Sequence, residues 1–126
     1  MKSLCLILVF FLIGCSRDIS NSSDKIHFNK DLWRSLQSLE TDEFGITARQ
    51  KMLDDLIEKH LIGKNKDEII SSLGDPSTKM DPDGEGRALS YPTGFERGSY
   101  MRIDSEWLLI YFDSSEIFKS YKIITD

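Results

Sequence analysis

The chain has 126 residues, a formal net charge of −5 at pH 7 and 40% hydrophobic residues. This length is enough for one compact domain with a modest core and for no more. An acidic chain has no general attraction for phosphate backbones, so nucleic acid is not an expected partner.

The N-terminal residues have the pattern of a secretory signal. Lys2 precedes an apolar run from Leu4 to Ile13, and the small residue Gly14 stands directly before Cys15. The run is too short to span a bilayer as a mature helix, and a basic start with about ten apolar residues is typical of a cleaved signal. The four residues that end at Cys15 resemble the lipobox of bacterial lipoproteins, which implies a lipid anchor of the palmitate type on Cys15.

This pattern divides the chain into three parts. Residues 1–14 are the expected signal peptide, residues 15–27 the expected lipid anchor and flexible tether, and residues 28–126 the expected domain. The tether is rich in serine, asparagine and charge, which cannot bury apolar area. The predicted location is the cell envelope, on a membrane and facing the periplasm or the exterior. The choice between inner and outer membrane stays open.

Two helices are predicted after an aromatic N-terminal segment. Phe28 and Trp33 are expected to pin that segment onto the core. The first helix is predicted over 47–61, because Thr47 and Gln50 form a capping box and apolar residues recur on one face. The second, short helix follows Asn65, which can cap it, and Gly74 ends it.

Strands are predicted over the rest of the chain. The segment 88–91 is a short candidate closed by Pro92, and 106–112 and 117–124 are rich in β-branched and aromatic residues. The expected fold is α+β, with the two helices packed on one face of a three-stranded antiparallel β-meander. The residues expected to pack on the sheet are Leu53, Leu56, Ile57, Ile70 and Leu73.

The order of elements resembles a known family. The segment from Gly63 to Pro76, with its apolar-Gly start and Leu-Gly-x-Pro end, followed by strands, is similar to the SmpA/OmlA-type small lipoproteins. The same helix-helix-sheet unit is found in β-lactamase-inhibitor-protein-like domains. This resemblance implies an envelope lipoprotein that binds other proteins.

The sequence offers no constellation for catalysis. His27 and His60 have no cysteine or HExxH partner, and no nucleophile elbow is present. The Asp81-x-Asp83-Gly84 segment departs from a calcium loop and is interpreted as a solvated turn. Neither a cofactor nor a metal is expected, and an enzyme is the least favoured of the functional classes.

The hairpin register predicts the binding surface. If Ser114-Ser115 is a two-residue turn, then Leu108 faces Tyr121 and the aliphatic side of the hairpin takes the helices. The opposite side then carries an open apolar patch, which marks an interaction surface. The predicted contact residues are Trp107, Leu109, Tyr111 and Phe118 of that side, with Phe95 and Tyr100 of the loop 95–104.

Two alternatives to an open patch remain. The segment 28–33 or the loop 95–104 could fold over it, and a one-residue slip of the hairpin would exchange its two sides. The function that follows is a lipid-anchored envelope binding module acting through protein–protein contact on the open sheet face. Its partners are the membrane, through the lipid on Cys15, and an envelope protein whose identity the sequence does not give. The alternative function is inhibition of a secreted or periplasmic enzyme.

Overall fold

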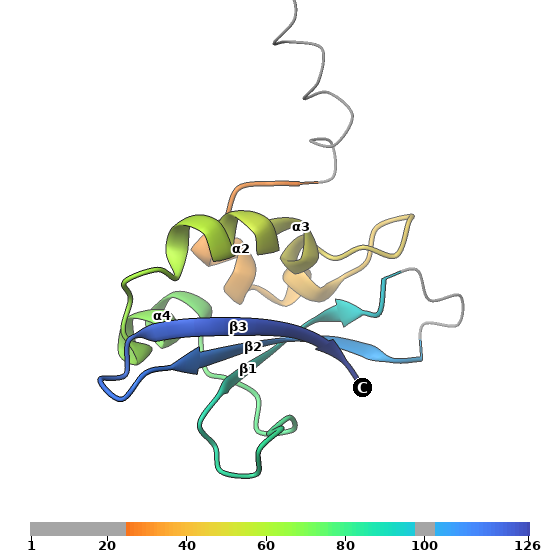
Figure 1. Ribbon diagram of the computed structural model, residues 1–126. Helices are drawn as coiled ribbons and strands as arrows, with labels where there is room; N and C mark the ends of the chain where they lie inside the picture. Colours follow the sequence, from red (N-terminus) through yellow and green to blue (C-terminus); the bar gives the residue numbers. More distant parts are fainter. Residues whose placement is uncertain (1–24, 98–102) are drawn as a thin grey trace, which may run out of the picture.

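The computed structural model describes residues 25–97 and 103–126, which form an α+β fold with a helical layer above a three-stranded antiparallel sheet (Figure 1). The helical layer comprises α2 (Lys30–Arg34), the 3-10 turn η2 (Leu36–Leu39), α3 (Ala48–Asp55), its π-helical continuation η3 (Leu56–His60) and α4 (Lys66–Leu73). The strands are β1 (Leu89–Phe95), β2 (Ser105–Phe112) and β3 (Phe118–Thr125). The predicted fold class is therefore confirmed, and α3 and α4 are its two longer helices.

The helix ends follow the side-chain signals of the sequence. Thr47 caps α3 and Asn65 caps α4, each in a reciprocal capping box with the Gln50 or Glu68 side chain three residues on. Gly74 ends α4 with φ at 86°, a left-handed conformation that costs glycine little. The predicted helix over 47–61 is present, but its last turn is π-helical.

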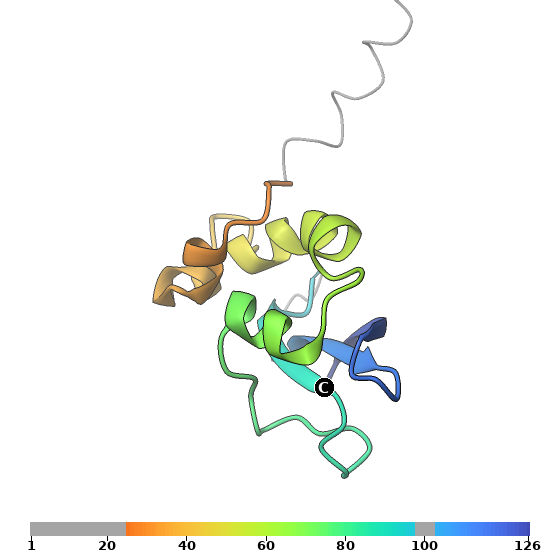
Figure 2. The same ribbon diagram turned by 90° about the vertical axis from the view of Figure 1, so that its left-hand side faces the viewer.

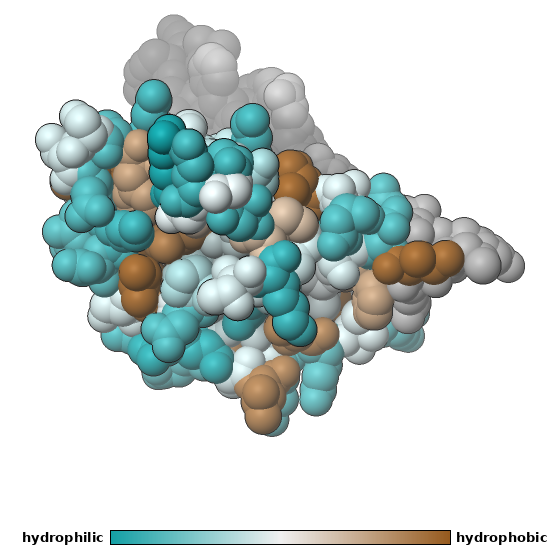
Figure 3. All heavy atoms as spheres, turned by 90° about the horizontal axis from the view of Figure 1, so that it is seen from below, coloured by the Kyte–Doolittle hydropathy of each residue, from teal (hydrophilic) through white to brown (hydrophobic). Residues whose placement is uncertain are grey.

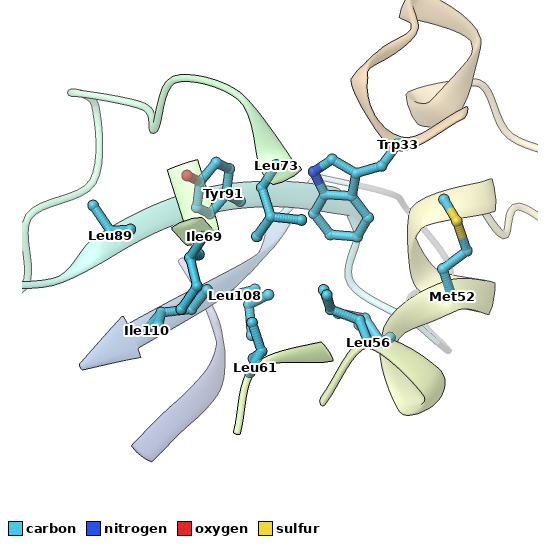
Figure 4. Close-up of a cluster of buried hydrophobic side chains, with 11 residues drawn as sticks. Trp33, Met52, Leu56, Leu61, Ile69, Leu73, Leu89, Tyr91, Leu108 and Ile110 are labelled. Atoms are coloured by element: carbon cyan, nitrogen blue, oxygen red, sulfur yellow. The ribbon is translucent and has the colours of Figure 1, made fainter. Parts of the chain in front are cut away.

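The core lies between the helices and the sheet (Figure 4). Trp33 is fully buried within it, so the N-terminal segment is pinned to the core as predicted. The helix residues predicted to pack on the sheet belong to the core or contact it, with Ile57 and Ile70 partly buried. The buried cluster comprises Trp33, Met52, Leu53, Leu56, Leu61, Ile69, Leu73, Leu89, Tyr91, Leu108 and Ile110.

The sheet has the order β1-β2-β3, so both outer strands are edges. The prediction that Pro92 closes the first strand is wrong, because β1 continues to Phe95 through a β-bulge between Pro92 and Gly94. Proline is tolerated there because β1 is an edge strand. Figure 2 shows the helical layer over one part of the sheet and β3 at the side away from it.

The predicted hairpin register is wrong by two residues. Leu108 pairs with Ile123 and not with Tyr121. The connection is longer than a two-residue turn, because the Asp113 carboxylate accepts hydrogen bonds from the backbone N–H groups of Ser115 and Ile117, at 2.8 and 3.0 Å. A shift of two residues keeps each side chain on its side of the sheet, so Leu108 and Ile110 still face the helices.

Candidate functional site

The predicted open aromatic patch does not exist as such. Trp107 is 7% exposed and Leu109 1% exposed, and Tyr111 is only half-buried. The side of the molecule seen from below carries apolar residues in separate spots among hydrophilic ones (Figure 3). The expectation of a continuous apolar surface on this face is therefore wrong.

A loop that was predicted only from its composition lies against part of this face, at Ser90. Residues 76–88 leave the edge of β1 and hang below the sheet (Figure 1). At that edge the Ser77 N–H donates to the Ser90 carbonyl at 2.8 Å, and the Ser90 hydroxyl donates to the Met80 carbonyl. Ser90 is the cross-strand partner of Leu109. Trp107 lies between Pro92 and Ile124 on the flanking strands, and its indole N–H points to the Asp126 carboxylate at 3.4 Å.

The remaining predicted contact residues are dispersed. Phe118 pairs with Phe112 through a bulge in the hairpin and packs against the core, so its placement beside Tyr111 on the open face is wrong. Phe95 lies at the end of β1 and is 39% exposed. Tyr100 and Cys15 lie outside the described residues.

Strand β3 is the least covered element of the sheet. Every residue from Lys119 to Ile123 is exposed, although the strand alternates between the two faces of the sheet. Tyr121 and Ile123, on the side of the helices, are 43% and 42% exposed. The helical layer therefore does not extend over β3, and both faces of this strand meet solvent.

The outer edge of β3 is open as well. The Asp126 N–H donates to the Ser105 carbonyl, so the backbone groups of Asp126 point toward β2. In an antiparallel strand this direction alternates from residue to residue, so the backbone groups of Tyr121, Ile123 and Thr125 point away from β2. Within the described part of the chain, these outward groups have no hydrogen-bond partner. Only the start of the strand is tied, where the Phe118 N–H donates to the Lys64 carbonyl at 2.8 Å.

A cationic hollow lies beside this strand. It has a volume of about 330 Å³ and is lined by Asp83, Arg87, Tyr111, Phe112, Lys119, Ser120 and Lys122. The Lys122 ammonium stands 5.7 Å from the centre of the Tyr111 ring. Neither lysine has a carboxylate partner among the described residues, whereas Arg87 pairs with Glu85. With Arg87 paired to Glu85, the two lysines against the one lining carboxylate, Asp83, leave this hollow positive in a chain of net charge −5.

Sequence reasoning missed this site because it treated β3 as one half of a hairpin with a single open face. One signal was available in the sequence. The segment 117–125 holds two lysines and no acidic residue in a chain where acidic residues outnumber basic ones. Lysines on a strand are typical of an edge exposed to solvent.

A second cleft lies elsewhere, against α3. It measures about 390 Å³ and is lined by Lys25, Asp42, Phe44, Ile46, Gln50, Lys51, Asp54 and Arg97. Its three cations are all paired, with Asp54, Asp42 and Glu106. Hydrogen bonds from the backbone of Ile46, then from the Lys51 side chain, lower the pKa of Asp42 to about 2. With its charges satisfied internally, this cleft offers a ligand no unpaired charge.

Metal ligation and membrane crossing find no support in the described residues. No group of three or more histidine, cysteine or carboxylate side chains in these segments is placed to hold a metal ion. None of the helices described has the length and apolar character needed to cross a bilayer.

The comparisons with known proteins give no relative. No family model, no curated protein and no solved structure matches the chain.

Proposed function

We propose that this protein is a lipid-anchored binding module of the bacterial cell envelope that acts through protein–protein contact. The signal pattern and Cys15 support the anchor, and the resemblance to the SmpA/OmlA-type lipoproteins supports the envelope location. Two or more acyl chains on one residue suffice for a stable anchor, whereas one chain gives only marginal binding.

The contact surface in this proposal is β3 and not the Trp107 face. The observation that carries it is the exposure of β3 on both faces and along its outer edge. A strand of this kind is a ready template for pairing with another chain. The opposite edge of this same sheet is closed by hydrogen bonds from Thr47, Arg49 and Gln50, so β3 is the edge that can accept another chain.

Photocrosslinking in the source bacterium tests the contact surface. A benzophenone amino acid is placed at Tyr121, and at Leu36 as the matched control. Leu36 is 94% exposed on the helical layer, so it reports chance encounters with envelope proteins. The expected result is a discrete crosslinked species from position 121 that position 36 does not give. Equal patterns from the two positions would contradict the proposed surface.

Fractionation tests the anchor separately. Cys15→Ser is expected to leave an uncleaved precursor or a soluble product in place of a lipidated protein in the membrane fraction. A Cys5→Ser variant is the control, because Cys5 lies within the expected signal and leaves with it. A lipidated Cys15→Ser protein in the membrane fraction would contradict the anchor.

A further inference from the structure

We infer that β3 accepts an extended acidic segment of a partner protein as a fourth strand of the sheet. The inference rests on the proposed function, because it names the chemistry of the partner that the binding module takes. The backbone geometry of this edge, the positive charge beside it and the apolar residues along it together determine which conformation and which side chains a partner segment needs.

The backbone of β3 sets the first requirement, which is an extended conformation. Tyr121, Ile123 and Thr125 present outward N–H and C=O groups at the spacing of every second residue. Only another β-strand offers complementary groups at that spacing over three residues. Main-chain hydrogen bonds of this type give affinity, while side-chain contacts on the two faces give specificity.

The two faces of β3 set the second requirement, which is an alternating side-chain pattern. On the side of the helices, Tyr121 and Ile123 offer apolar surface that is more than two-fifths exposed. Next to the strand, Lys119, Lys122 and Arg87 line the cationic hollow. Because side chains alternate faces along a strand, the partner segment needs apolar residues at every second position and acidic residues between them.

The same charges disfavour a second copy of this chain as the occupant. Pairing two β3 strands would bring together Lys119 and Lys122 from both copies, and residues 117–125 contain no acid to offset them. Like charges facing each other across strands are destabilising. An acidic segment of another protein would instead place a carboxylate opposite Lys122 on the edge strand, and opposite charges paired across strands are stabilising.

A designed peptide provides the probe. The peptide acetyl-Thr-Thr-Val-Glu-Val-Glu-Val-Thr-amide, fluorescently labelled, is titrated with the full-length protein in a mild non-ionic detergent. We expect saturable binding at low salt that weakens as salt is raised, and at least tenfold weaker binding of a peptide with lysine at both glutamate positions. Equal binding of the two peptides would overturn the inference.

Charge reversal on the protein completes the test. The Lys119→Glu/Lys122→Glu variant is expected to lose at least tenfold in affinity for the acidic peptide and to gain affinity for the lysine peptide. The matched control is Lys25→Glu/Lys30→Glu, which makes the same change in net charge on the N-terminal segment, and its affinity is expected to stay within about twofold. Equal losses in the two variants would show attraction by overall charge and overturn the site.

The edge is tested by backbone methylation and hydrogen exchange. N-methylation at peptide positions 3 and 5, which face Ile123 and Tyr121 in an antiparallel pairing, should abolish binding, whereas methylation at positions 4 and 6 should not. Bound peptide should slow exchange at the Tyr121 and Ile123 amides of the protein. Binding that survives methylation at 3 and 5, or that leaves these amides unprotected, would overturn strand addition.

The cellular crosslink separates this inference from the proposed function. If the species formed from position 121 is lost in the Lys119→Glu/Lys122→Glu variant, the protein recognises acidic side chains of the partner and the inference is supported. If that species persists at full yield in the variant, the binding module stands and the acidic partner is wrong. A dimer of this chain as the only crosslinked species would overturn the acidic partner as well.

Discussion

The two edges of the sheet differ in how their outward backbone groups are used. On β1, the carbonyls of Ser90, Pro92, Thr93 and Phe95 all point outward, and each accepts a hydrogen bond from another part of the chain. On β3, the corresponding groups from Tyr121 onward have no partner within the described segments. One edge is therefore part of the folded structure, while the other is available.

Helix α3 closes the β1 edge with side chains from its first turn. The Thr47 hydroxyl donates to the Thr93 carbonyl, the Gln50 amide donates to the Phe95 carbonyl at 2.8 Å, and Arg49 donates to the Pro92 carbonyl at 2.9 Å. Arg49 also reaches the Trp33 carbonyl and lies 4.7 Å above the Trp33 ring. Burial lowers the pKa of Arg49 to about 10, which leaves it charged at neutral pH.

We therefore expect stability and binding to depend on opposite edges of this small sheet. A substitution at the closed edge should change the free energy of unfolding, because it disturbs contacts between α3 and β1. A substitution at the open edge should change partner binding and leave unfolding nearly unchanged.

Gly94→Ala should be the most damaging change at the closed edge. Gly94 has φ at 149°, and a Cβ there would come within 2.8 Å of Thr47 Cγ2 and 3.0 Å of the Gln50 amide. Backbone strain and overpacking together should cost about 2–5 kcal/mol of unfolding free energy, measured by urea denaturation. Gly84→Ala is the control, because its φ is 71° but no atom lies within 4 Å of the new Cβ. An equal cost at both glycines would contradict the close approach of α3.

Thr47→Val should cost less, about 1–3 kcal/mol by the same measurement. The substitution keeps the shape of the side chain but removes the hydroxyl that accepts from the Gln50 N–H and donates to the Thr93 carbonyl. Thr47 is fully buried, so both partners would be left without a bond. Thr47→Ser keeps the hydroxyl and should retain more of the stability, and the reverse order would rule out this role for the hydroxyl.

Acid should loosen the helical layer behind the closed edge. A hydrogen bond from the Phe28 N–H, with help from Lys59, lowers the pKa of Asp55 to about 2, and Asp42 is lowered similarly. Because the folded pKa lies below the unfolded value, this stabilisation is complete above about pH 4 and is lost as pH falls toward 2. The protection factors of the Phe28 and Ile46 amides, taken against intrinsic exchange at each pH, should therefore fall over this range. The Asp42→Asn/Asp55→Asn variant should lack that fall, and an identical response would exclude these carboxylates as its cause.

The sequence could predict the features of the two sheet edges that depend on residues close together in the chain, but not those that depend on residues far apart. The caps at Thr47 and Asn65 are local signals, and both were predictable from residues three positions apart. The order of helices and strands was predictable too, because hydrophobic periodicity marks each element. The second use of Thr47, which bonds to Thr93 46 residues away, has no local signal.

The errors have a similar origin. The hairpin register failed because the Asp113 side chain organises a five-residue connection, while the prediction considered only Ser114 and Ser115. The prediction of an open patch was wrong partly because a glycine- and aspartate-rich loop carries no hydrophobic pattern, yet its Met80 carbonyl accepts a hydrogen bond from Ser90, the cross-strand partner of Leu109. An Asp at the start of a turn is a recognisable signal for the first error, but the second required tertiary contacts.

Substitutions at the open edge should have the smallest effect on stability and the largest on binding. Tyr121→Ser and Ile123→Ser each remove a side chain that is more than two-fifths exposed, so the loss should stay below about 1 kcal/mol. Leu108→Ala is the control within the same ladder, because Leu108 pairs with Ile123 but is fully buried, and it should cost about 2–5 kcal/mol. Peptide affinity should fall at least fivefold in both β3 variants, because the apolar face of the added strand loses its counterpart. A β3 variant that unfolds as readily as Leu108→Ala would place Tyr121 or Ile123 in the core, and the contrast between the two edges would then fail.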